Sequence, residues 1–286
     1  MKYTFIAAHE MQFHIKRMCK ALEVQRSGYY AWRCRLPSKR AQSNKALLVL
    51  IEEEHEKSRK TYGSPRLYVV LRRKGVMCGQ KRVARLMRLK GIAAKRKGSY
   101  HPVTTQRQPG MVPAPNHLNQ DFFAPAPNQK WVSDFTYIKT GEGWLYLAVV
   151  MDLFSRKVIG WAMSKAMDTV LVETALRMAL LGRRPAAGLL HHSDQGSQYT
   201  SDAYRLCLTT ALTQLSMSGV GNCYDNAVIE SFFSTLKTEC VIDLFPTCAE
   251  ARTTIFEYIE VWYNRQRLHS TLGYRSPIDY ENQFTL

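Results

Sequence analysis

The sequence predicts an α/β protein: an all-α region of helix-turn-helix type, followed by a mixed sheet with flanking helices. Three observations lead to this fold class. The hydrophobic pattern changes near residue 130 from a repeat of about 3.6 residues, typical of helices, to one of about 2, typical of strands. Residues 99–130 hold 6 of the 11 prolines. The excess of positive charge lies before residue 131.

Net charge divides the chain into two unlike parts. Residues 1–130 hold 27 Lys and Arg against 7 Asp and Glu, a net charge of +20, whereas residues 131–286 have a net charge of −3. A basic surface that only needs solvation would be spread evenly, so the first part predicts a polyanionic partner. DNA, RNA and anionic membrane all satisfy that prediction. The hydrophobic content of 45% is that of a globular protein and argues against global disorder.

The cysteines and the apolar segments bear on the compartment. Seven cysteines are scattered without a CxxC pair or a zinc-ligand spacing, as in reduced cytosolic proteins. The apolar run near the N-terminus is too short for a signal peptide. The longest internal run, WLYLAVVM, has the length of a strand and not of a membrane span. We therefore expect a cytoplasmic protein with no membrane partner.

The prolines predict the domain boundaries. Dense proline is incompatible with helix interiors and central strands, so residues 99–130 are expected to form an extended linker. The linker separates a basic helical region, residues 1–98, from a second domain, residues 131–286. The change in charge falls at the same place and supports the division independently.

The basic region is expected to be a set of short helices. Helical patterns occupy residues 11–33, 44–59 and 64–92. The last of these has two apolar stripes on either side of a glycine-containing turn at 75–79, which is helix-turn-helix geometry: Leu67, Val70 and Leu71, then Val83, Leu86 and Met87.

The second helix of this pair carries the candidate DNA contacts. Lys81, Arg85 and Arg88 share the face opposite the apolar stripe. With the neighbouring Arg82 they are the basic side chains that we expect to reach nucleic acid. A solvated face on a small bundle is the alternative, and the concentration of charge in this region favours nucleic acid.

The second domain alternates strands and helices after an initial hairpin. The expected strands are 130–140, 143–153, 156–164, 188–194 and 212–218, and the expected helices are 169–181, one from about 201, one within 221–239, and 248–265. Asp225 is expected to cap the helix within 221–239 at its N-terminus. Antiparallel strands followed by alternating helices and strands predict a mixed sheet covered by helices.

Three acids stand out in this domain. Asp134 lies mid-strand in an apolar context, Asp194 ends a strand, and Glu230 lies on a helix 35 residues after Asp194. Ligands of open sheets bind at the carboxyl ends of strands. Taken singly, each acid also has a structural explanation, because Asp194 precedes a glycine turn and Asp134 could pair with a buried arginine.

Together, three clustered carboxylates predict a metal site. They would repel one another at neutral pH unless a cation compensates them. Oxygen-only ligands favour a hard cation, Mg²⁺ or Mn²⁺. Two such ions about 4 Å apart can assist an in-line phosphoryl transfer, which suits a phosphodiester substrate.

Several segments resemble a known family. WVSDFTYI, HHSDQGSQYTS and GNCYDNAVIESFFSTLKTE, which contain Asp134, Asp194 and Glu230, resemble the D,D-35-E catalytic core of retroviral-type integrases and transposases. VQRSGYYAW, YGSPR, MDLFSRKVIGW and YNRQRLHSTLGYRSP resemble the second-frame transposase (OrfB) of the bacterial insertion-sequence-three family. The likeness covers nearly the whole chain.

The resemblance implies an RNase H-like core in which Asp134, Asp194 and Glu230 bind the metal and Lys237 contacts DNA near the element's end. It implies cleavage of insertion-sequence ends at the terminal inverted repeats, followed by strand transfer into target DNA. The implied partners besides DNA are further copies of the chain on DNA and a fused or separate upstream-frame protein. Bound to DNA, the chain would be associated with the nucleoid.

Other polar and aromatic residues are expected to be structural. Asp152 ends a strand, where Arg156 is the expected partner. Packing or hydrogen bonding is expected for His191, His192 and His269, and core positions for Trp144 and Trp161. The polar residues at the end of the last helix could contact DNA or cap that helix: Tyr263, Asn264, Arg265, Arg267 and His269.

The functional hypothesis is therefore a metal-dependent DNA transposase. Two alternatives remain at the level of sequence. A DNA-binding regulator would keep the second domain only as a scaffold, and an RNase H-like nuclease would cleave DNA without joining it.

Overall fold

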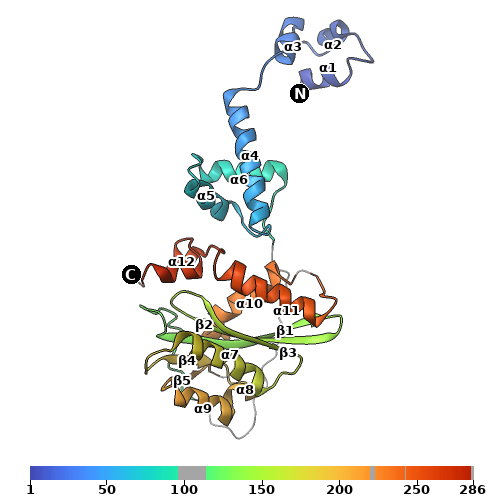
Figure 1. Ribbon diagram of the computed structural model, residues 1–286. Coiled ribbons are helices and arrows are strands. Elements are labelled where there is room, and N and C mark those ends of the chain that lie inside the picture. Colours follow the sequence, from blue (N-terminus) through green and yellow to red (C-terminus); the bar gives the residue numbers. More distant parts are fainter. Residues whose placement is uncertain (96–113, 220–222, 242, 285–286) are drawn as a thin grey trace.

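The computed structural model describes residues 1–95, 114–219, 223–241 and 243–284. It begins with three short helices, α1 (Lys2–Ala8), α2 (Ile15–Ala21) and α3 (Arg26–Arg33). Their buried side chains form a small core of their own: Ile6, Met18, Cys19 and Tyr29. In Figure 1 these helices lie at the end of α4 that is far from the sheet. The sequence pattern predicts α2 and α3, and α1 adds to them.

The helix-turn-helix region follows as α4 (Lys39–Lys57), α5 (Ser64–Arg73) and α6 (Gln80–Lys90). The predicted apolar stripes supply its buried core: Leu67, Leu71, Val83, Leu86 and Met87. Gly75 in the connecting turn has a φ of +79°, a left-handed conformation that favours glycine. The predicted pair of helices joined by a glycine-containing turn is confirmed.

A five-stranded sheet forms the second half of the molecule. Its strands are β1 (Lys130–Thr140), β2 (Gly143–Asp152), β3 (Val158–Ser164), β4 (Leu190–Ser193) and β5 (Gln214–Met217). Their spatial order is β3-β2-β1-β4-β5. Strands β1, β2 and β3 pair antiparallel, whereas β4 pairs parallel with both β1 and β5. The predicted mixed sheet is confirmed.

Helices cover both faces of the sheet, as the two-residue alternation of β2 requires. Leu147 and Val149 belong to the core shared with α10 (Ala227–Glu239) and α11 (Cys248–Glu257), whereas Ala148 and Val150 belong to the core under α7 (Thr169–Arg183). Figure 1 shows α10 and α11 on one side of the sheet, and α7, α8 (Ser197–Thr200) and α9 (Asp202–Thr210) on the other.

The end of the chain departs from the single long helix predicted for 248–265. Helix α11 stops at Glu257, and a π-helical turn continues it from Tyr258 to Tyr263. Asn264 follows, and its side-chain amide bonds both backbone groups of Val158 in β3, donating to the carbonyl at 2.9 Å and accepting from the N–H at 3.0 Å. A short 3-10 turn (Ser270–Leu272) and α12 (Pro277–Asn282) complete the fold.

The predicted linker is described only in part. Residues 99–113 lie outside the described residues, and residues 114–129 contain neither helix nor strand. Part of this segment lies against the edge strand β5, because the backbone N–H of Leu118 donates to the Ser216 hydroxyl at 3.1 Å.

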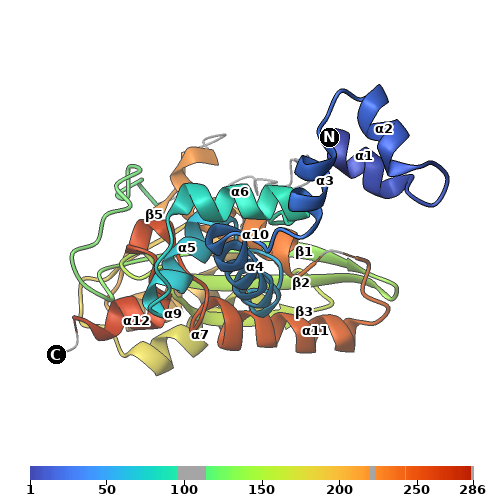
Figure 2. The ribbon, with the colours of Figure 1, turned by 90° about the horizontal axis from the view of Figure 1, so that it is seen from above.

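Figure 2, which looks down on α4, α5 and α6, shows these helices over the α10 and α11 face of the sheet.

None of the helices in the described part of the chain is both long enough and apolar enough to cross a bilayer.

Candidate active site

Asp134 and Asp194 occupy adjacent positions on parallel strands. The register of β1 and β4 pairs Ser133 with Ser193. Asp134 is the residue after Ser133 within β1, and Asp194 directly follows Ser193, the last residue of β4. The β1–β4 pairing ends at these serines, while β1 continues to Thr140. Both aspartates therefore lie where the shorter strand stops, and both are partly exposed. This is the strand-end position at which the sequence predicts a site.

Helix α10 brings the other two predicted residues to the same region. Its apolar side, with Ile229, Phe232 and Leu236, is buried in the core. Glu230 is exposed near the start of the helix, and Lys237 follows two turns later on the same face. The Lys237 ammonium lies 4.9 Å from the centre of the Tyr137 ring.

Electrostatics shows that these groups act on one another. Burial and the charge of Asp194 raise the pKa of Asp134 well above its usual range, and the charge of Glu230 adds to this. A hydrogen bond from the Phe135 N–H and the charge of Lys237 offset only part of the effect. Burial in turn lowers the pKa of Lys237, against the influence of Asp134. The three acids and the lysine thus form one electrostatic cluster.

The cluster matches the donor chemistry of a hard-cation site. Its ligand atoms are all carboxylate oxygens, the donors that Mg²⁺ and Mn²⁺ prefer. Within the residues that the structure describes, no three His, Cys, Asp or Glu side chains are grouped closely enough to hold a metal ion. The repulsion that raises the pKa of Asp134 is the kind that a bound cation relieves.

Two aromatic residues, Trp144 and Tyr137, lie beside Lys237 of this cluster. The sequence predicted a core position for Trp144 and no site role for Tyr137. Trp144 is 47% exposed and not in the core, so its predicted core position is wrong. Its ring packs edge-on against Tyr137, with centroids 5.1 Å apart. Trp144 is the second residue of β2, next to the hairpin turn and opposite the exposed Lys139. The Tyr137 ring contacts the Lys237 ammonium. The sequence pattern places Tyr137 in a strand but does not indicate this contact.

Asp225 does not cap α10, so this prediction is wrong. The cap position is Asn226, which makes no side-chain capping bond, and Asp225 is buried in the preceding 3-10 turn. Its carboxylate accepts a bond from the Asn116 side chain at 2.9 Å and one from the Gly219 N–H at 3.0 Å. Asp225 therefore connects the described part of the linker segment to the loop after β5.

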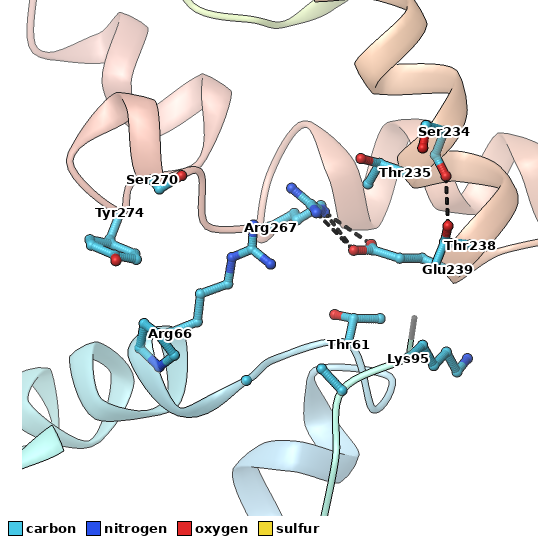
Figure 3. Close-up of a pocket in the computed structure, with 13 residues that line it drawn as sticks. Thr61, Arg66, Lys95, Ser234, Thr235, Thr238, Glu239, Arg267, Ser270 and Tyr274 are labelled. Carbon is cyan, nitrogen blue, oxygen red and sulfur yellow. Dashed lines mark hydrogen bonds and ion pairs between the residues drawn. The ribbon is translucent and has the colours of Figure 1, made fainter. Parts of the chain in front are cut away.

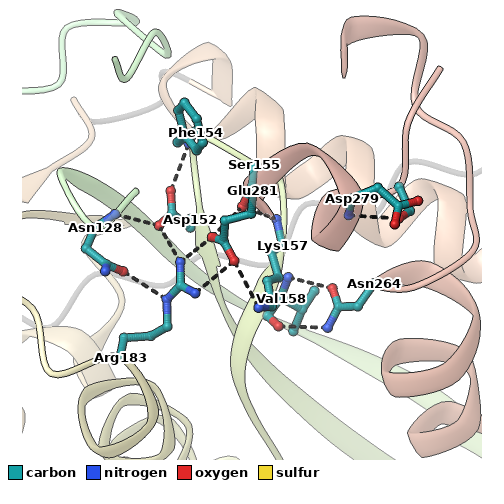
Figure 4. Close-up of polar contacts among 11 residues, drawn as sticks. Asn128, Asp152, Phe154, Ser155, Lys157, Val158, Arg183, Asn264, Asp279 and Glu281 are labelled. Carbon is teal, nitrogen blue, oxygen red and sulfur yellow. Dashed lines mark hydrogen bonds and ion pairs between the residues drawn. The ribbon is translucent and has the colours of Figure 1, made fainter. Parts of the chain in front are cut away.

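Asp152 is structural as predicted, but its partner is Arg183 and not Arg156 (Figure 4). The Arg183 guanidinium donates to Asp152 at 3.2 Å and also pairs with Glu281 of α12. Backbone N–H groups of Asn128 and Phe154 donate to the same carboxylate at 2.7 and 2.8 Å. Burial raises the pKa of Asp152, and these donors and Arg183 act in the opposite direction.

The two strand histidines have packing roles. His191 bonds the Ser133 hydroxyl at 2.8 Å, and His192 bonds the Ser216 hydroxyl at 2.8 Å. Burial lowers the pKa of His191 to about 3 and that of His192 to about 4, so both rings are neutral at physiological pH. His269 packs edge-on against Tyr263, with centroids 4.9 Å apart, and burial lowers its pKa to about 3.

The predicted DNA contacts on α6 divide into two kinds. Lys81, Arg85 and Arg88 are exposed. Arg82 is half-buried, and its guanidinium donates to Asn44 and Ser43 of α4, both at 2.8 Å. Arg82 thus holds two helices of the helix-turn-helix region together, while the other three side chains face solvent.

Family models match both halves of the molecule. Residues 124–223 and 212–277 match two models described as "Integrase core domain", and residues 42–100 match one described as "HTH-like domain". The fold and the acidic cluster thus define a protein of the integrase and transposase class with an integrase core.

Two curated relatives are similar along almost their whole length. "Transposase InsF for insertion sequence IS3A" of Escherichia coli (strain K12) is 45% identical over 287 residues, 99% of each chain. "Insertion element IS600 uncharacterized 31 kDa protein" of Shigella sonnei is 44% identical over 268 residues, 93% of this chain and 98% of that one. The chain belongs to the IS3 family of insertion-sequence transposases.

Solved structures were matched as well. The simian T-cell lymphotropic virus intasome in complex with PP2A regulatory subunit B56 gamma has a TM-score of 0.47 at 14% identity, with 81% of this chain and 74% of that chain covered. The HTLV-2 integrase catalytic core domain in complex with magnesium (trimeric form) has a TM-score of 0.41 at 17% identity, covering 56% of this chain and 99% of that chain.

Proposed function

We propose that this transposase cleaves the ends of its insertion sequence and joins the freed 3′ ends to target DNA by a D,D-35-E mechanism. The observation that carries the proposal is the adjacent placement of Asp134 and Asp194 on parallel strands, with the charge of Glu230 acting on Asp134. The charges of Asp194 and Glu230 oppose ionisation of Asp134, and a metal-dependent phosphoryl transfer gives this costly arrangement a use.

In this proposal Asp134, Asp194 and Glu230 hold Mg²⁺ or Mn²⁺. When bound, the metal supplies Lewis-acid stabilisation to the attacking and leaving oxygens of the phosphodiester. Asp134 and Asp194 are fixed by the sheet, whereas Glu230 is carried by α10. The helix therefore sets how closely the third carboxylate approaches the other two.

Basic residues orient the DNA in the same proposal. Lys237 lies on the Glu230 face of α10 and would contact a phosphate next to the reacting bond. Lys81, Arg85 and Arg88 on α6 would contact the phosphates of the terminal inverted repeats. Arg82 would hold α6 in place through its hydrogen bond to Asn44 of α4. Assembly of several copies on DNA and a fused or separate upstream-frame partner are further parts of the proposal.

The test is a strand-transfer assay with the purified full-length protein. Labelled duplexes that carry the element's end are incubated with Mg²⁺ and a target plasmid, and nicked and joined products are separated on a denaturing gel. A transposase gives both products. Joining that persists in Glu230→Gln at the wild-type rate contradicts the assignment of Glu230.

The two alternatives give different patterns in the same assay. A regulator binds the end duplex and produces no nick in Mg²⁺. A nuclease of this fold produces nicks but no joined product at any time. Either pattern, obtained with protein that binds the end duplex, overturns the proposed function.

A further inference from the structure

A cavity of about 500 Å³ lies between the helix-turn-helix region and the catalytic half, and the acids Asp134, Asp194 and Glu230 are not among its lining residues (Figure 3). One wall comes from the start of α5 and the segment after α6, and the other from α10 and the chain around residues 267–274. Two sequence motifs that the proposed chemistry does not use, YGSPR (62–66) and YNRQRLHSTLGYRSP (263–277), meet here.

Backbone contacts fix the two motifs against each other. The Tyr62 hydroxyl accepts a hydrogen bond from the Leu268 N–H at 2.8 Å and lies 3.3 Å from the Gln266 carbonyl. Arg73 donates to the Tyr274 carbonyl at 2.6 Å. These hydrogen bonds hold the two walls of the cavity together, so the fold itself fixes the shape of the cavity.

The acid in this cavity is already neutralised. Glu239 on α10 is buried, and its carboxylate accepts bonds from the Arg267 guanidinium at 2.8 to 3.1 Å. The Tyr258 hydroxyl and the Trp262 indole N–H donate to the same carboxylate at 3.0 and 3.3 Å. These donors engage the Glu239 carboxylate, which makes no ion pair with Arg66.

Arg66 is the second guanidinium in the cavity, and it has no acid within the described chain that pairs with it. Figure 3 shows its side chain extending toward Arg267. Its one recorded partner is the Tyr62 ring, 5.5 Å from the guanidinium carbon. Burial lowers the pKa of Arg66 and the charge of Arg267 lowers it further, whereas the charge of Glu239 offsets only part of this decrease. Two like charges that face each other across a cavity are unfavourable unless an anion lies between them.

Further donors line the same space. Ser234 of α10 and Ser270 have hydroxyl groups that make no hydrogen bond with the described residues, and Lys95 has no ion pair there. The hydroxyls of Thr235 and Thr238 donate to backbone carbonyls one turn earlier, at 2.8 Å each. An arginine fork, an ammonium and hydroxyl donors around a cavity without a free acid constitute the donor set that binds phosphate.

We propose that this cavity binds a backbone phosphate of the DNA substrate, with Arg66 as the central donor and Ser234 and Ser270 as hydroxyl donors. Ser234 lies one turn beyond Glu230 on α10, so a phosphate held here is linked by one rigid helix to the catalytic face. The site would fix where the duplex crosses from α6 to the acidic cluster. The inference rests on DNA as the substrate of the proposed function, and not on the three catalytic acids.

The experiment measures binding of an element-end duplex by the full chain in EDTA, as a function of salt concentration. Arg66→Gln is compared with Arg177→Gln, which removes the same charge from an exposed position on α7, on the opposite face of the sheet. Loss of one phosphate contact reduces the slope of log K against log salt by about 1 and weakens binding roughly tenfold near 0.1 M salt. We expect this change for Arg66→Gln and none for Arg177→Gln.

Equal slopes for Arg66→Gln, Arg177→Gln and the wild type overturn the proposal. Circular dichroism establishes that each variant is folded. If Arg66→Gln does not fold, Ser234→Ala and Arg66→Lys take its place, because both keep the packing of the walls. Each is expected to weaken binding about threefold to tenfold, and wild-type affinity in both overturns the proposal.

A second arm separates a DNA phosphate from a small anion. Inorganic phosphate is titrated against the wild type and Arg66→Gln while the thermal midpoint is followed. Protection by phosphate that depends on Arg66, with DNA binding unchanged by the substitution, identifies a small-anion site and overturns the DNA assignment. Because metal is absent, a protein that fails to cut DNA still reports on this site, so the two proposals fail separately.

Discussion

Two groups of acids lie on or beside neighbouring strands of the sheet, and they differ in what balances their charge. At the end of β2, Asp152 shares Arg183 with Glu281, and Lys157 donates to Glu281 at 3.0 Å. On β1, which pairs directly with β2, Asp134 faces other acids, and Lys237 is the cation that acts on it. Asp152 and Glu281, here called the closed group, are ion-paired with Arg183 and Lys157. Asp134, Asp194 and Glu230 are here called the open group, in which burial and the other two acids raise the pKa of Asp134 despite Lys237.

The pKa directions of Glu281 and Asp134 differ, although burial also raises the pKa of Asp152 in the closed group. Burial opposes ionisation of Glu281, but Arg183 and Lys157 outweigh it and lower the pKa of that carboxyl. At Asp134 burial and the neighbouring acids act together, and the pKa rises well above its usual range. Since an acid at a strand end can be either structural or functional, the surrounding charge distinguishes the two cases better than strand position does.

The largest expected effect is on chemistry. Asp194→Asn removes one carboxylate of the open group while keeping its size, and we expect strand cleavage and joining to fall more than about a thousandfold, since metal-assisted charge stabilisation is worth several kcal/mol. The measurement is the rate of product formation from labelled element ends in Mg²⁺. Asp202→Asn, at an exposed position of α9, is the control and should keep wild-type rates.

The next effect concerns the closed group and appears in stability. Arg183→Met leaves Asp152 and Glu281 without their shared cation, and we expect a loss of about 3–5 kcal/mol in the free energy of unfolding. Urea denaturation measures it. Arg177→Met on the same helix removes only an exposed pair with Glu173 and should cost less than about 1 kcal/mol. Equal costs for the two variants would contradict the contrast.

The third prediction concerns how the stability of the fold depends on the ionisation of Asp134 in the open group. Because the folded-state pKa of Asp134 lies above 3.8, its usual value, the folded protein binds this proton more tightly than the unfolded chain does, and stability falls as pH rises through that window. Asp134→Asn should therefore have a higher Tm than the wild type at neutral pH, measured without metal. The difference should shrink as the pH is lowered toward 3.8.

The smallest effect is expected for the cation of the open group. Lys237→Ala removes a half-buried ammonium from the Tyr137 ring, and we expect joining of element ends to weaken about tenfold, the worth of one charge-assisted phosphate contact. Lys139→Ala, at an exposed position of β1, is the matched control. Joining by Lys237→Ala at the rate of Lys139→Ala would remove Lys237 from the proposed mechanism.

Local pattern was sufficient for most of the fold. The alternation of apolar residues gave β1, β2 and β3, and the stripes on α5 and α6 gave the helix-turn-helix pair, because each depends on neighbours within a few turns. The sequence predicted that the three acids cluster, but the β1–β4 register that makes Asp134 and Asp194 neighbours was not predicted. Their role in metal binding stays a prediction.

What the pattern could not supply depends on distant partners. Asp225 sits at a helix start and would suit a cap, yet Asn116 binds its side chain from 109 positions away. Asp152 has Arg156 close in sequence, but Arg183 reaches it from α7. Trp144 is apolar and in a strand, yet it packs on the Tyr137 ring near the hairpin turn and stays half-exposed. Each of these outcomes is set by tertiary packing, which a local window does not contain.

The side chain of Asn264 has a consequence for how copies of the chain meet. Strand β3 is an edge of the sheet, and an exposed edge offers unpaired backbone groups to any passing strand. The Asn264 amide occupies both backbone groups of Val158 and so takes the place of one residue of a neighbouring strand. At this position the edge of the sheet is therefore already capped from within the chain and offers no free backbone pair to the strand of another copy.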